Sequence, residues 1–131
     1  MPNYDWYQKL LKPTWAPPAW IFGPVWTVLY IIIAASFGYV GYLFAKGKIP
    51  FVVLLPFILN LIFNLAFTPL QFGLKNNLLA AVDILFVLGT LTWLIWAIWP
   101  YIRWVALVNI PYLLWVIFAT VLQITVTIKN W

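Results

Sequence analysis

Residues 104–128 read WVALVNIPYLLWVIFATVLQITVTI, and no charged side chain interrupts these 25 residues. About 20 consecutive apolar residues are enough for a helix to cross the hydrocarbon core of a bilayer. Three other stretches are similarly long and poor in charge: residues 13–45 and 49–74 carry no charged side chain, and residues 76–102 carry only Asp83. We therefore expect an all-α membrane protein, an antiparallel bundle of four transmembrane helices near residues 19–44, 50–73, 77–99 and 104–128.

The first 18 residues differ from the rest of the chain. They are amphipathic, and Pro13, Pro17 and Pro18 oppose a smooth helix into the first span. The sequence therefore predicts two parts. Residues 1–18 would form an amphipathic N-terminal segment that lies on the membrane surface or covers the bundle as a lid, and residues 19–131 would form the helical bundle.

The composition excludes several classes of protein. Of the 131 residues, 66% are hydrophobic and 7% are charged, and the mean hydropathy is +1.03. A soluble domain normally carries about 25% charged residues, so the lipid bilayer must be the main partner of this surface. The chain has no Cys and no His, which argues against thiolate chemistry and against a metal site. The seven basic residues are scattered near the ends of the spans, so nucleic acid is not an expected partner.

Polar side chains within the spans are the first candidates for function, because they are costly in lipid. In the second span, Asn60, Asn64, Phe67 and Gln71 recur at helical spacing and share one face. The amides could hold a bound organic ligand, or they could tie helices together by hydrogen bonds. Asp83 has a similar pair of interpretations, a structural role near a helix end or proton coupling in a transporter.

Aromatic residues make up 21% of the chain, including 10 Trp, and they form stripes. The first span carries Phe22, Trp26 and Tyr30 at steps of four, and in the last span Ala119 follows Trp115 by one turn. Two facing stripes with a small residue between them would form a slot for a flat, apolar molecule. Ordinary helix packing is the alternative interpretation.

Small residues suggest a further packing face in the first span. Ala34 and Gly38 are one turn apart, as are Gly41 and Ala45. Such residues let helix backbones approach closely. The face would hold helices together within one bundle or between two protomers, and we expect the former.

Three segments together resemble the TspO/MBR family, the translocator proteins or tryptophan-rich sensory proteins. Residues 12–30 read KPTWAPPAWIFGPVWTVLY, residues 60–83 read NLIFNLAFTPLQFGLKNNLLAAVD, and residues 111–120 read PYLLWVIFAT. The resemblance runs from about residue 6 to residue 130. The family has five spans, and this chain begins where the family's first loop would be, so we expect four spans here. The Tyr of the sterol motif of vertebrate members is missing from the last span, so sterol recognition by that motif is not expected.

The resemblance implies a membrane receptor that binds porphyrins, with the porphyrin as ligand and no cofactor. Family members commonly form homodimers, and a bacterial or archaeal cell membrane is expected rather than the mitochondrial outer membrane. The tryptophans linked in the family to light-dependent porphyrin breakdown match Trp26 and Trp115, the only expected catalytic residues. Transport of porphyrins or other amphipathic molecules is the alternative function, and a purely structural helper subunit is a further one. The implied ligand-binding residues are Tyr7, Trp15, Pro17, Phe22, Trp26, Tyr30, Asn60, Asn64, Phe67, Trp115 and Ala119.

Overall fold

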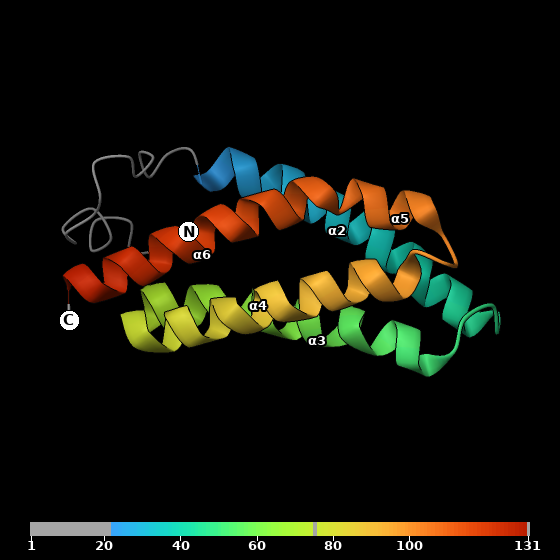
Figure 1. Cartoon of the computed structure of the whole chain (residues 1–131), viewed down its shortest axis with the longest axis horizontal. Helices are drawn as coiled ribbons and strands as arrows, with labels where there is room; N and C mark the ends of the chain where they lie inside the picture. The colour runs from blue at the N-terminus through green and yellow to red at the C-terminus, as the bar shows by residue number, and fades with distance from the viewer. Residues whose placement is uncertain (1–21, 75, 131) are drawn as a thin grey trace.

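The computed structural model describes residues 22–74 and 76–130, and it is helical throughout these ranges apart from short connectors. The helices are α2 (Phe22–Ala45), α3 (Phe51–Thr68), the π-helix η2 (Pro69–Gly73), α4 (Asn77–Ile98), α5 (Arg103–Val108) and α6 (Ile110–Lys129). They lie side by side along one axis, and the short connectors make successive spans antiparallel (Figure 1). The predicted all-α membrane architecture is confirmed.

Three helical segments are long and apolar enough to cross a membrane. They are Gly23–Ala45, Asn77–Ile98 and Arg103–Lys129, with 23, 22 and 27 residues. The α3 helix is shorter, with 18 residues, and η2 continues it by five more. The chain is thus a multi-pass integral membrane protein, and the described helices follow the predicted spans closely.

Two of the predicted spans are not continuous α-helices. The second changes at Pro69 into a π-helix, in which the Leu74 amide donates to the Pro69 carbonyl over 2.8 Å. The fourth is broken at Asn109 into α5 and α6, where the prediction had one helix. Pro111 explains this break, because it has no N–H to donate to the Leu107 carbonyl one turn earlier.

The α4 helix lies at the centre of the packing. It contacts α3 most extensively and α6 next, whereas α2 has its close backbone contacts with α3 and α5. Leu91, Leu94 and Ile98 are fully buried on α4, yet Leu85 and Phe86 on the same helix are about half exposed. Large apolar side chains on the outside are expected here, because the acyl chains around the bundle are as apolar as its interior.

The small residues of the first span do not pack helices together within this bundle. Ala34, Gly38 and Ala45 are exposed. At Gly38 and Gly41, no atom of another described helix lies within 4 Å of the position that a Cβ would take. The interpretation of these residues as an internal packing face was wrong for the described residues, because this face of α2 is turned outward.

Candidate ligand site

A buried hydrogen-bond cluster joins α3 to α6. The Asn64 side-chain amide donates to the Tyr112 hydroxyl over 2.6 Å, and that hydroxyl donates to Asn60 Oδ1 over 3.0 Å. Asn60 and Tyr112 are fully buried, and Asn64 is 3% exposed. The helical spacing that places both amides on one face of α3 thus lets a single phenol from α6 bridge them.

Asn60 uses its hydrogen-bonding groups within the protein. Its Nδ2 donates to the Val87 carbonyl over 3.0 Å and to Thr90 Oγ1 over 3.1 Å, both on α4. With Tyr112 on its Oδ1, this one side chain ties α3 to two neighbouring helices. The structure therefore favours the helix-tying interpretation for Asn60, and a ligand contact by this residue stays a prediction.

Two other buried oxygen atoms have spare acceptor capacity. Asn64 Oδ1 and Asp83 Oδ2 have no hydrogen-bond partner among the residues that the structure describes. A buried acceptor without a donor costs about 1–3 kcal/mol. A molecule that supplied hydrogen-bond donors here would remove that cost.

Aromatic side chains form close pairs on α2 and on α6. On α2 the rings of Trp26 and Tyr30 are 5.6 Å apart at an angle of 33°, and on α6 those of Trp115 and Phe118 are 5.4 Å apart at 40°. Both tryptophans are partly buried and pack against the hydrophobic core. They do not point wholly into lipid, which is the arrangement that a slot between α2 and α6 requires.

The remaining predicted residues divide into two groups. Phe67 and Ala119 are partly buried and also pack against the core. Tyr7, Trp15 and Pro17 lie outside the described residues, as does the predicted N-terminal segment of residues 1–18, and of Phe22 only the backbone is described.

Sequence reasoning missed Tyr112, which is the centre of the cluster. The sequence did contain a signal for Tyr112. This residue precedes Trp115 by about one helical turn, and it is a phenol in a membrane span of a bundle whose other spans carry amides. Within residues 22–74 and 76–130 no three His, Cys, Asp or Glu side chains gather as metal ligands. The chemistry that these side chains offer is hydrogen bonding and stacking.

Comparison with known proteins identifies the family and several relatives of the chain. The model of the TspO/MBR family matches residues 1–128. The chain is 42% identical over 123 residues to the tryptophan-rich protein TspO of Bacillus cereus, covering 92% of this chain and 78% of that protein. It is 34% identical over 131 residues to the tryptophan-rich sensory protein of Cereibacter sphaeroides, covering 97% and 78%. It is 36% identical over 130 residues to the human translocator protein, covering 95% and 75%.

The bacterial relatives support the expected bacterial or archaeal membrane. The family match spans nearly the whole chain, and three described segments have the length and hydropathy of membrane-spanning helices. This chain therefore belongs to the TspO/MBR family of integral membrane proteins.

Proposed function

We propose that this protein is a membrane receptor of the TspO type that binds a tetrapyrrole, a free-base porphyrin, between α2 and α6. The observation that supports the proposal is that two kinds of group occur in one bundle. Trp26 on α2 and Trp115 on α6 pack against the hydrophobic core that includes Tyr112, and two buried acceptors, Asn64 Oδ1 and Asp83 Oδ2, lack donors from the described residues. A porphyrin combines a flat apolar face with polar groups, so it suits both.

In this proposal, the indole rings of Trp26 and Trp115 stack on the porphyrin. An aromatic pair contributes about 0.5–1.5 kcal/mol beyond the burial of its area. Trp26 and Trp115 stand on different helices, so they would contact different parts of one macrocycle. Ala119, one turn after Trp115, would leave room beside its ring.

In this proposal, Asn64 and Asp83 form hydrogen bonds with the porphyrin. The pyrrole N–H groups of a free-base porphyrin lie at the centre of its ring, so Asn64 Oδ1 or Asp83 Oδ2 could accept a hydrogen bond from them only from a face of the macrocycle. The carboxylates of the porphyrin would avoid Asp83, because like charges repel in a medium of low dielectric constant. They would lie toward the membrane surface, where Lys129 ends α6.

The function would be sensory, and the homodimer expected from the resemblance is part of the proposal. Binding would bias a response to tetrapyrroles or to stress. A photoexcited porphyrin can also exchange electrons with an indole, so light-dependent breakdown of the ligand through Trp26 and Trp115 is the chemical activity that the site could add.

A fluorescence and absorbance titration with protoporphyrin IX in nanodiscs tests this proposal. We expect saturable quenching of Trp fluorescence together with a shifted porphyrin absorbance band. The double variant Trp26→Phe with Trp115→Phe should weaken binding about ten-fold, the equivalent of roughly 1.4 kcal/mol for two stacking contacts. Asn64→Leu should also weaken it, because it removes one of the acceptors.

Trp96→Phe is the matched control, since Trp96 is 77% exposed and lies near the other end of α4. It should leave the affinity unchanged. Non-saturable quenching by the wild-type protein, or an equal affinity in the double variant and the Trp96 control, would refute a site between α2 and α6. Illumination of the complex adds a second readout, because loss of porphyrin absorbance should slow in the double variant.

A further inference from the structure

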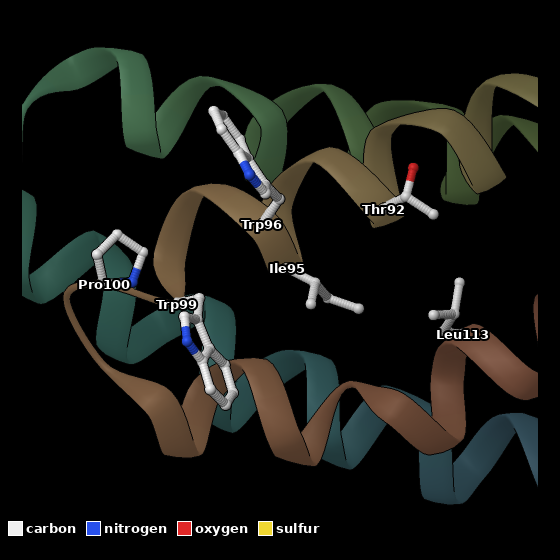
Figure 2. Close-up of a pocket in the computed structure, with 6 residues that line it drawn as sticks. All are labelled: Thr92, Ile95, Trp96, Trp99, Pro100 and Leu113. Atoms are coloured by element: carbon white, nitrogen blue, oxygen red, sulfur yellow. The ribbon is translucent and has the colours of Figure 1, made fainter.

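An apolar groove lies near the end of α4, and one of its lining residues, Leu113, follows Tyr112 directly in α6. Its volume is about 550 Å³, and it is open to the surroundings. The lining residues come from α4, from the connector that follows it and from α6: Thr92, Ile95, Trp96, Trp99, Pro100 and Leu113. Figure 2 shows Ile95 and Leu113 turned toward the same space between α4 and α6, with Trp99 and Pro100 at one end of it.

The groove follows the last two turns of α4 and the connector after it. Trp99 and Pro100 follow the last residue of α4, whereas Thr92 lies seven residues before Trp99, which is about 10 Å along a helix. Exposed tryptophans are typical of the interface between lipid and water. Trp99 is 44% exposed and Trp96 is 77% exposed, so both rings are accessible to lipid. The groove thus has the direction of an acyl chain.

A cation lies against Trp99, one of the residues that line the groove. The Arg103 guanidinium lies over the Trp99 ring, 5.4 Å from its centroid. A guanidinium stacked on a ring keeps the N–H groups at its edge free to donate, and this planar fork suits phosphate oxygens. Asp83, the one carboxylate in the described ranges, lies about 22 Å along α4 from Ile98 and cannot pair with Arg103.

We propose that the groove and Arg103 form a binding site for one anionic phospholipid. One acyl chain would lie along Ile95, Leu113 and Thr92, and the headgroup phosphate would pair with Arg103 beside Trp99. Charge complementarity and the apolar lining together select this occupant. A soluble anion would leave the groove unfilled, and a neutral lipid would gain less from Arg103.

Native mass spectrometry of the purified full chain tests this site. The protein is exchanged into detergent with equimolar phosphatidylglycerol and phosphatidylcholine of the same acyl chains, and the retained lipid is counted. We expect one phosphatidylglycerol to be retained with about a five-fold preference, since one basic residue near an anionic headgroup contributes about 1 kcal/mol. Arg103→Gln should abolish the preference, and Arg103→Lys should retain only part of it, because Lys keeps the charge but not the planar fork.

Two further variants locate the site. Lys48→Gln is the matched control, because Lys48 is an exposed cation in the connector at the same end of the bundle. It should keep the preference. Thr92→Trp fills the groove from an exposed position, and it should reduce retention of both lipids at this site.

The proposal is overturned by any of three results. Equal retention of the two lipids by the wild-type protein would show that Arg103 selects no headgroup. Loss of the preference in Lys48→Gln to the same degree as in Arg103→Gln would show a general effect of positive charge. If Thr92→Trp left lipid retention intact and instead dissociated a dimer, the groove would be an interface with a second copy.

Discussion

At the scale of single residues, Tyr112 decides how the bundle closes. Its hydroxyl accepts from Asn64 and donates to Asn60, two residues that are 48 and 52 positions away in the chain. Each of these buried groups would otherwise meet only apolar surroundings, which is costly in the absence of water. One phenol therefore pairs with one group of each amide and ties α6 to α3.

Tyr112→Phe should destabilise the bundle by about 1–3 kcal/mol, because it leaves Asn60 Oδ1 and Asn64 Nδ2 without their partner. Thermal unfolding in detergent, followed by circular dichroism, measures this change. Tyr101→Phe is the control, since Tyr101 is 46% exposed and lies in a connector. Equal melting temperatures for the two variants would mean that the Tyr112 hydroxyl holds nothing together.

At the scale of the elements, caps and prolines set where helices begin and break. The α4 helix begins after Asn76, whose side chain accepts a hydrogen bond from the Leu79 amide over 2.9 Å. This interaction satisfies one of the four amides that have no partner in the first turn of a helix. The connector before α4 is short, so the cap also fixes where the third span leaves the second.

Asn76→Ala should cost about 1 kcal/mol, because Ala cannot accept from the Leu79 amide. Asn76→Asp keeps an acceptor oxygen at the same place and should be close to neutral. Chemical denaturation in mixed micelles gives both values. The capping role would be wrong if Ala and Asp at this position gave the same free energy of unfolding.

At the scale of the whole molecule, the surrounding lipid changes how much the burial of an apolar side chain contributes to the stability of the fold. In water, a buried Leu gains from leaving the solvent and from packing. In a bilayer the unfolded span stays in acyl chains, so only the packing part distinguishes inside from outside. This is why α4 can be apolar on every side while still having a buried face with Leu91 and Leu94.

Leu91→Ala should therefore destabilise the bundle by about 1–2 kcal/mol, less than the 2–5 kcal/mol of a soluble core. Leu85→Ala, on the outward face of the same helix, should change stability by less than about 0.5 kcal/mol. Leu91 is fully buried and Leu85 is 49% exposed. Unfolding of both variants in lipid micelles checks this difference, and equal losses would contradict the assigned inward face of α4.

Much of the candidate site could be predicted from the sequence. The spacing of Asn60 and Asn64 predicted a shared polar face, and the steps of four in α2 predicted the neighbouring rings of Trp26 and Tyr30, which lie 5.6 Å apart. These are properties of one helix, and helical geometry alone determines them. The roles of Asn60 and Tyr112 could not be predicted in this way, because their partners stand on other helices.

The sequence by itself determined that the chain is an all-α membrane protein and where its spans lie, because long uncharged runs have one stable solution in lipid. Its motifs also determined its family. Only the tertiary structure decided which face of each span is inside, what Asn60 binds, and that the Arg103 guanidinium lies over the Trp99 ring. The reason is physical: when acyl chains and protein interior are equally apolar, hydropathy does not mark the inner face, and side-chain packing and hydrogen bonds between helices must choose it.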